Sequence, residues 1–169
     1  MNLHDIIKPE SVLCNVDAGS KKYAIEILGK LLVRGDETLS GDEIFASLIE
    51  RERLGCTALG NGAAMPHARI VGASAPVAAF LRLTEAVEFD TPDGEPVDLI
   101  FGMIVPQETD EDDVRDFEDI MRRFSDPEFQ ASLRSARSSN DLFERLTERP
   151  LADSQEHNPD AKDNDQAMQ

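Results

Sequence analysis

The sequence predicts an α/β domain in which helices flank a small mixed β-sheet. Amphipathic helical patterns come first, apolar strand patterns follow near the middle, and further helical patterns complete the folded part. The chain has 169 residues, of which 40% are hydrophobic, and a single hydrophobic core usually serves roughly 100 to 200 residues. We therefore expect one domain that occupies residues 1–149.

The first two helices are predicted by capping residues and by apolar side chains that share one face. Ser20 can cap the start of the first helix, and Gly35 follows its last apolar position as a stop signal. Ser40, with Glu43 three residues later, has the pattern of a capping box for the second helix, which continues to Gly55. The apolar positions are Ala24, Ile27, Leu28, Leu31 and Leu32 in the first helix, and Ile44, Phe45, Leu48 and Ile49 in the second.

Two apolar runs in the middle of the chain predict strands. Residues 77–83 form the first, and residues 97–105 form the second, which is almost wholly apolar and is therefore expected to be buried on both faces. Residues 91–94, with the sequence Thr-Pro-Asp-Gly, supply turn chemistry between them. Residues 12–16 are a weaker strand candidate.

Three more helices are predicted after the strands. The first of them follows the acidic cluster at residues 108–113, and Asp126-Pro127 opens a short second one. Ser138 and Asp141 open the last. The apolar positions are Val114, Phe117, Ile120, Met121 and Phe124 in the first of these helices, and Leu142, Phe143 and Leu146 in the last.

The charge balance excludes several classes of function. Thirty-four acidic and 17 basic residues give a formal net charge of −17, which repels phosphate backbones and anionic lipid surfaces. The longest apolar run, residues 99–105, is far shorter than the roughly 20 residues of a spanning helix, and the first ten residues lack a signal-peptide pattern. We expect a cytoplasmic protein that neither binds nucleic acid nor inserts into a membrane.

The end of the chain and the two cysteines have simpler interpretations. Residues 150–169 are acidic and nearly devoid of apolar side chains, so they predict a disordered tail. Cys14 and Cys56 are too few for a disulfide scaffold and are expected to be free thiols.

One histidine has a setting that suggests chemistry. His67 ends the segment Gly60-Asn61-Gly62-Ala63-Ala64-Met65-Pro66-His67, in which two glycines permit unusual backbone geometry and a proline restricts it. We expect this rigid loop to hold the imidazole in place, whereas His4 and His157 have no comparable setting. A held neutral imidazole can bind a metal or act as a base or nucleophile.

The surrounding residues favour some of these reactions over others. No second histidine or cysteine pair has metal-ligand spacing with His67, so we expect neither a metal nor another cofactor. Arg51, Arg53 and Arg69 are local cations in a negative chain, and a guanidinium can grip two phosphate oxygens at once. Arg51 could equally interact with the negative end of the helix dipole, and Arg53 and Arg69 could be ordinary solvent-exposed charges.

The segment from Arg51 to His67 resembles the active-site stretch of the IIA components of the bacterial phosphoenolpyruvate-dependent phosphotransferase system, mannitol and fructose type. The shared pattern is an arginine-glutamate pair followed by Gly-x-Gly-x-Ala-x-Pro-His, and Cys56 stands where serine is usual. The nitrogen-regulatory branch is the most similar. Residues 96–106 resemble the central strand of that family, and the likeness covers roughly residues 3–147.

The resemblance implies a fold, a reaction and a set of partners. His67 would accept a phosphoryl group from a histidine phosphocarrier protein, and Arg51 would stabilise that group. In the family a second histidine usually begins the helix after the central strand, and Asp113 occupies that position here. An aspartate could orient the imidazole but would also repel a phosphoryl group. The regulated partners would include potassium-transport or nitrogen-regulation proteins.

Three alternatives remain open at this point. The chain could be the IIA subunit of a separate fructose or mannitol permease. It could be a binding module that is not phosphorylated, since Asp113 replaces the second histidine. It could also be a thiol enzyme in which Cys56 is the nucleophile and His67 its base, although no third orienting group is evident.

Overall fold

The computed structural model describes residues 2–148, and within them a six-stranded mixed sheet is flanked by helices, as predicted. The strands are β1 (Ile7–Val16), β2 (Ala58–Gly60), β3 (Ala63–Ala64), β4 (His67–Ile70), β5 (Val77–Val87) and β6 (Val97–Pro106). The helices are α1 (Leu3–Ile6), α2 (Lys21–Val33), α3 (Gly41–Leu54), α4 (Glu111–Phe124), α5 (Pro127–Arg134) and α6 (Ser139–Thr147). The tail predicted at residues 150–169 lies outside the described residues.

Strand β6 is the centre of the sheet. The strand order is β1-β5-β6-β3-β2, and β4 also pairs with β6. Strand β5 pairs with β6 in the antiparallel sense, whereas β3 and β4 pair with β6 in the parallel sense. Successive β6 residues point to opposite faces of the sheet, so Ile100 and Phe101 enter different hydrophobic clusters. The predicted burial of this strand on both faces is confirmed.

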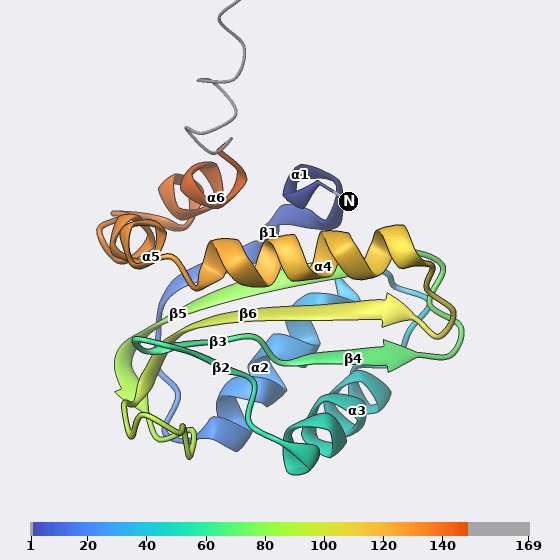
Figure 1. Cartoon of the computed structure of the whole chain (residues 1–169), viewed down its shortest axis with the longest axis horizontal. Coiled ribbons are helices and arrows are strands. Elements are labelled where there is room, and N and C mark those ends of the chain that lie inside the picture. The colour runs from blue at the N-terminus through green and yellow to red at the C-terminus, as the bar shows by residue number, and fades with distance from the viewer. Residues whose placement is uncertain (1, 149–169) are drawn as a thin grey trace, which may run out of the picture.

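The helices form one layer on each side of the sheet (Figure 1). Helices α2 and α3 cover one face and bury side chains such as Leu28 and Leu48 against it. Helices α1, α4, α5 and α6 cover the other face, where Phe124 contacts the rings of Phe80 and Phe101. The edge strand β4 lies where both layers come within reach, because α3 packs on it from one side and α4 approaches from the other.

The predicted helix starts are confirmed, with one correction. Ser20 accepts a hydrogen bond from the Tyr23 amide, and Ser138 accepts one from the Asp141 amide. Ser40 does begin α3, but its side chain makes no capping hydrogen bond, so the capping box predicted with Glu43 does not form. The acidic first turn of α3 still complements the helix dipole.

Four elements are absent from the sequence prediction. Strands β1 and β5 extend well beyond the predicted residues 12–16 and 77–83, and β6 ends one residue later than predicted. Helix α1 and strands β2, β3 and β4 contain two to four residues each, too few to show a periodic pattern. One correction concerns the site: His67, predicted at the end of a loop, is the first residue of strand β4.

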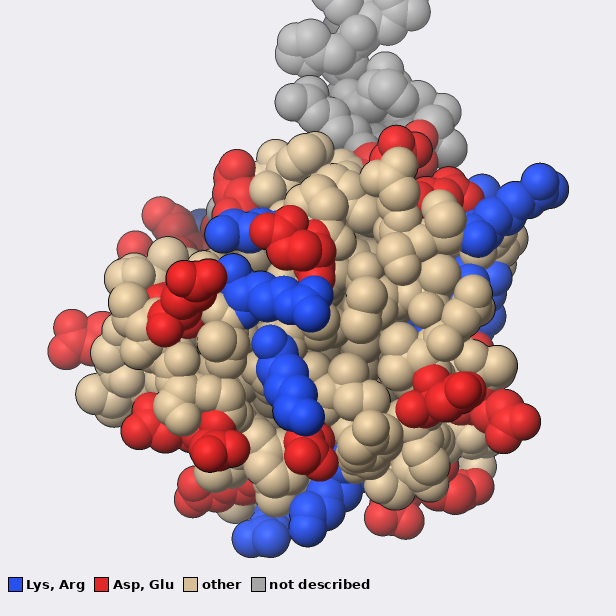
Figure 2. All heavy atoms as spheres, turned by 180° about the vertical axis from the view of Figure 1, so that it is seen from behind, with Lys and Arg blue, Asp and Glu red and all other residues tan. Residues whose placement is uncertain are grey.

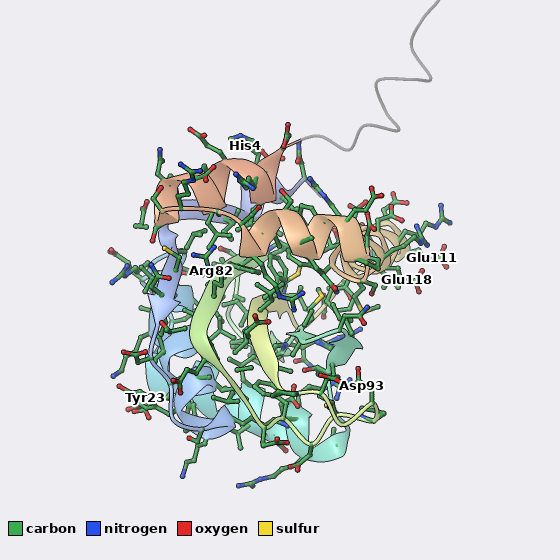
Figure 3. The ribbon with its side chains drawn as sticks, turned by 90° about the vertical axis from the view of Figure 1, so that its left-hand side faces the viewer. His4, Tyr23, Arg82, Asp93, Glu111 and Glu118 are labelled. Carbon is green, nitrogen blue, oxygen red and sulfur yellow. The ribbon has the colours of Figure 1, made fainter. Side chains whose placement is uncertain are left out.

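The surface reflects the charge of the chain. Figure 2 shows acidic side chains spread around one face, with lysine and arginine side chains in a line that runs down this face and in a further group at its right-hand edge. On the side seen in Figure 3, Arg82 of β5 donates hydrogen bonds to the carbonyl oxygens of Leu133 and Ala136 at the end of α5. This capping ties α5 to the sheet.

Within residues 2–148, no helix has the length and apolar composition needed to cross a bilayer.

Candidate functional site

The glycine-rich segment before His67 is a sharp turn between β2 and β3. Gly60, Asn61 and Gly62 have φ angles of 91°, 55° and 81°, a left-handed run that glycine adopts without strain and asparagine tolerates. A Cβ at Gly62 would also lie 2.8 Å from Arg134 Nη2 and 3.2 Å from the carbonyl oxygen of Pro96, so a larger residue would displace the Arg134 side chain. The two glycines predicted to permit unusual geometry therefore do so.

This turn is fixed to the body of the domain. The carbonyl oxygen of Gly62 accepts hydrogen bonds from the amides of Asp98 and Leu99 at 3.0 and 3.1 Å. Arg134 forms a two-pronged ion pair with Asp98 and donates to the carbonyl oxygen of Asn61 at 2.5 Å. The chain thus enters β3 and β4 from an anchored point.

The imidazole of His67 is held by a main-chain carbonyl. His67 Nδ1 lies 2.9 Å from the carbonyl oxygen of Met65, and a carbonyl can only accept, so Nδ1 carries the ring proton. The lone pair is consequently on Nε2. Residue Met65 is itself fixed in place, since its backbone amide donates to the carbonyl oxygen of Thr57 at 2.9 Å and its side chain is buried.

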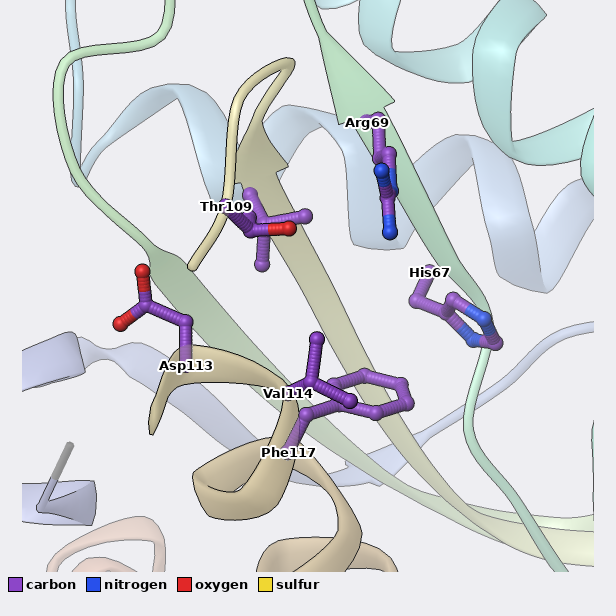
Figure 4. A pocket seen from close by; sticks show the side chains of 7 residues that line it. His67, Arg69, Thr109, Asp113, Val114 and Phe117 are labelled. Atoms are coloured by element: carbon purple, nitrogen blue, oxygen red, sulfur yellow. The ribbon is translucent and has the colours of Figure 1, made fainter. Parts of the chain in front are cut away.

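One side of the ring opens onto a small hollow of about 150 Å³ between β4 and α4. Phe117 forms one wall, with its ring centroid 4.8 Å from that of the imidazole at an angle of 61°. Figure 4 shows the side chains that line the hollow around His67. Besides His67 and Phe117, they are Arg69, Val105, Thr109, Asp113 and Val114.

The protonation of His67 follows from these surroundings. Burial lowers its pKa from the ordinary value of 6.5 and is the largest influence. The hydrogen bond to Met65 raises the pKa, the charge of Arg51 lowers it, and the charge of Glu52 raises it. The net pKa is lowered, so His67 is neutral at pH 7 and its Nε2 lone pair is available.

Arg51 lies in the last turn of α3, close enough for its charge to act on His67. Its Nη1 donates to the carbonyl oxygen of Gly55 at 3.1 Å, which is the helix-terminal interaction considered above. Because a guanidinium has five N–H donors, this bond leaves others for a ligand. Arg69 is exposed and lines the hollow, whereas Arg53 is exposed and does not.

Asp113 lines the same hollow from the first turn of α4. Its carboxylate is directed away from the imidazole, and Val114 and Phe117 lie between the two groups (Figure 4). The backbone amide of Asp113 donates to the side chain of the N-cap residue Asp110 at 2.8 Å, so position 113 belongs to the capped first turn of α4. The structure thus brings Asp113 to the rim of the site without an observed hydrogen bond to His67.

Comparison with known proteins places this site in a family. The model of the phosphoenolpyruvate-dependent sugar phosphotransferase system EIIA 2 family matches residues 5–149. The chain belongs to this EIIA 2 family. The resemblance inferred from Arg51 to His67 is therefore confirmed, and the site lies in a phosphotransferase IIA domain.

Individual relatives agree with the family assignment. A nitrogen regulatory protein of Pseudomonas aeruginosa is 36% identical over 144 residues, which cover 85% of this chain and 94% of that protein. The fructose-specific EIIA component of Haloferax volcanii is 31% identical over 129 residues, 76% of this chain and 84% of that protein.

Solved structures show the same architecture. The crystal structure of nitrogen regulatory protein IIA-Ntr from Neisseria meningitidis has a TM-score of 0.79 and 36% identity, and the match covers 85% of this chain and 97% of that chain. The mannitol IIA of Escherichia coli, with a TM-score of 0.66 and 21% identity over 82% of this chain and 97% of that chain, shares the fold.

Two residues beside His67 in this IIA domain were missed by sequence reasoning as site residues. Phe117 was predicted only as an apolar position of its helix. Glu52 is buried, with 4% of its side chain exposed, and forms an ion pair of 2.9 Å with Lys21. A signal for Glu52 exists, because Ile44, Leu48 and Glu52 follow one another at intervals of four along the buried stripe of α3.

The thiol of Cys56 does not pair with His67, as the thiol-enzyme alternative would require. Its Sγ lies 3.5 Å from the carbonyl oxygen of Phe89, to which the thiol can donate. Among the hydrogen bonds of residues 2–148, none joins Cys56 to His67. Both cysteines are free thiols, as expected.

Proposed function

We propose that His67 accepts a phosphoryl group on Nε2 from a histidine phosphocarrier protein, and that the phosphorylation state of His67 governs which proteins the chain binds. The observation that carries this proposal is the hydrogen bond from Nδ1 to the Met65 carbonyl. It leaves the Nε2 lone pair on a neutral ring, as a nucleophile requires.

The transfer can be written with all atoms accounted for. The Nε2 lone pair forms a bond to phosphorus as the phosphorus–nitrogen bond of the donor histidine breaks. The electron pair of that broken bond remains on the donor ring nitrogen. His67 Nδ1 keeps its proton throughout, because the Met65 carbonyl oxygen accepts from it before and after transfer.

Arg51 is the residue proposed to stabilise the transferring group. Its charge already acts on His67, and its remaining N–H groups can pair with phosphoryl oxygens while Nη1 stays on Gly55. Asp113 has the opposite effect in this proposal: a carboxylate on the rim of the hollow repels a phosphoryl dianion and slows transfer.

The added charge is the proposed signal. A phosphoryl group brings about −1.5 to −2 charges to a surface where a neutral ring stood, so partners that bind one form will reject the other. The names of the relatives favour a role in nitrogen regulation. The partners in this proposal are therefore nitrogen-regulation proteins, with potassium-transport proteins as a second proposed class. The fructose-specific relative supports a second candidate, the IIA subunit of a sugar permease.

A labelling experiment tests the proposal. The protein is incubated with labelled phosphoenolpyruvate, enzyme I and a phosphocarrier protein, and then with acid or alkali. We expect an acid-labile, alkali-stable label that is lost in His67→Ala and kept in His4→Ala, whose histidine lies on α1. Phosphorus-31 NMR should place the phosphorus on Nε2. A wild-type protein that never labels overturns the proposal and favours a binding module. A label that survives in His67→Ala also overturns it, because another residue is then the acceptor.

A further inference from the structure

Glu52 has an environment unlike that of the other acidic residues on α3. Residues Asp42, Glu43 and Glu50 of this helix are exposed, whereas Glu52 is 8% exposed as a whole residue. Burying a carboxylate is costly unless charged or hydrogen-bonding partners compensate for lost water. Here Lys21 of α2 supplies the charge at 2.9 Å, and the Thr57 hydroxyl donates a hydrogen bond to the other carboxylate oxygen.

These partners connect Glu52 to the imidazole through a short series of contacts. Thr57 bonds Glu52 through its hydroxyl, and its carbonyl oxygen accepts the amide of Met65 at 2.9 Å. The Met65 carbonyl oxygen in turn accepts from His67 Nδ1 at 2.9 Å. A buried carboxylate is thus linked, through Thr57, to Met65, the residue whose carbonyl oxygen fixes the orientation and the tautomer of His67.

Lys21 anchors this series to a second helix. Its Nζ lies 2.9 Å from Glu52, donates to the carbonyl oxygen of Phe89 at 3.3 Å, and lies 4.8 Å from the centroid of the Phe89 ring. The ammonium group is thereby fixed on three sides. Glu52 therefore has a defined position and little freedom to move away from the site.

The charge of Glu52 matches a need of the proposed reaction. When Nε2 bonds to phosphorus while Nδ1 keeps its proton, the ring acquires positive charge, and burial opposes that charge. The charged groups near the ring are Arg51 and Glu52 from α3, Arg69 from β4 and Asp113 from α4. Of the two charges shown to act on the ring, Glu52 alone favours a cationic imidazole.

We propose that Glu52 is a positioning residue for phosphoryl transfer, which holds the Thr57–Met65 backbone and stabilises the positive ring of phosphorylated His67. This inference rests on the proposed function. Arg51 and Glu52 then have complementary tasks, although they are neighbours in sequence: Arg51 faces the negative phosphoryl group, and Glu52 supports the positive ring. Consecutive helix residues point about 100° apart, which allows this division.

The test compares Glu52→Gln with Glu50→Gln. Glutamine keeps the shape of Glu52 and an oxygen that can accept from Thr57, but it removes the charge. The Glu50 variant removes the same charge from an exposed position on the same helix. For each protein, the pKa and tautomer of His67 are measured by NMR, and the rate of labelling is measured at a fixed concentration of phosphorylated carrier.

For Glu52→Gln we expect a lower pKa of His67 and labelling about tenfold slower, with a smaller fraction phosphorylated at equilibrium. Glu50→Gln should match the wild type in each measurement. If Glu52→Gln fails to fold, Thr57→Val and Glu52→Asp replace it. Thr57→Val removes the hydrogen bond to Glu52 and should slow labelling, whereas Glu52→Asp keeps the charge and should retain part of the wild-type rate.

The outcomes separate this inference from the proposed function. A Glu52→Gln protein with the wild-type His67 pKa, tautomer and labelling rate overturns the inference while leaving phosphorylation of His67 intact. A wild type that never labels overturns the proposed function, and with it the role of Glu52 in transfer. A shift of the His67 pKa in Glu52→Gln would then still show that Glu52 sets the state of the ring.

Discussion

The two sides of His67 are built in opposite ways. On the α3 side, Glu52, Thr57 and the Met65 peptide form a series of hydrogen bonds that ends on Nδ1. On the α4 side, the ring meets the Phe117 side chain and a small hollow with mostly apolar walls. One side is saturated with polar partners, and the other leaves room.

The two sides therefore have different tasks. The α3 side, which we call the holding side, fixes the imidazole, and the α4 side, the receiving side, leaves space for an incoming group. A polar network with its hydrogen bonds formed fixes a side chain, whereas an apolar wall lowers the cost of expelling water when another molecule arrives. The sheet makes the division possible, because β4 is the strand on which α3 packs while α4 borders its hollow. Substitutions at three positions, Arg51, Phe117 and Asp113, can break or sharpen this contrast.

Arg51 should give the largest effect, because it is the cation of the holding side whose charge acts on the ring. We expect transfer to slow about a hundredfold in Arg51→Ala, in line with the loss of one preorganised donor to a developing charge. Arg51→Lys keeps the charge but loses the planar fork, so we expect a loss of about tenfold. The rates come from transient labelling, and melting temperatures report on the fold.

Arg53 supplies the matched control for Arg51. It lies in the same last turn of α3, is exposed and does not line the hollow, so Arg53→Ala should transfer within about twofold of the wild type, as solvated charges contribute little. Equal rates in Arg51→Ala and the wild type would make Arg51 a helix-terminal residue only, bonded to Gly55.

Phe117 tests the receiving side. Burial is the main reason that the pKa of His67 is lowered, so Phe117→Ala should admit water and raise that pKa toward 6.5. It should also lower the free energy of unfolding by about 1–2 kcal/mol, less than a fully buried phenylalanine because Phe117 is half-buried. NMR titration and urea unfolding measure the two effects.

The pH dependence of stability has a definite sign here. Because the folded pKa lies below the unfolded value of 6.5, the contribution of His67 to stability is complete above pH 6.5 and declines as the pH falls from there through the folded pKa. The difference between wild type and His67→Gln isolates this contribution. In Phe117→Ala the decline should be smaller, and an unchanged pKa would show that Phe117 does not dry the ring.

Asp113 should give the smallest effect. Asp113→Asn keeps the shape but removes a charge at the rim, and exposed charges are screened by water and salt. We expect transfer to become faster by no more than about threefold, with the gain shrinking at high ionic strength. Asp112→Asn, an exposed neighbour outside the hollow, is the control. Slower transfer in Asp113→Asn would instead support Asp113 as a partner that orients His67.

The long elements of the fold were accessible from the sequence, and the short ones were not. Helices α2 and α3 and the central strand β6 have enough residues to display a period, and their interiors are apolar where the period requires. Strands β2, β3 and β4 have no such length. Strands β3 and β4 form by pairing with β6, and β2 forms by pairing with β3. That tertiary pairing has no local signature.

The site was predictable in its residue types but not in its arrangement. The motif singled out His67 and Arg51, the two residues to which the proposed function assigns phosphoryl transfer. The ring tautomer depends on a carbonyl two residues away, and the wall on a helix 50 residues later, so neither could be read from the segment itself. The buried stripe of α3 could have revealed Glu52, since an acid at an apolar position of a helix demands an explanation.

The group that sets the state of His67 belongs to the backbone, which affects how the site can change. A point mutation at position 65 can alter the sulfur-containing side chain but cannot delete the peptide oxygen that receives the Nδ1 proton. Substitutions at position 65 should therefore leave the reactivity of His67 unchanged. Only a change that moves the backbone at Met65 would remove the hydrogen bond to Nδ1.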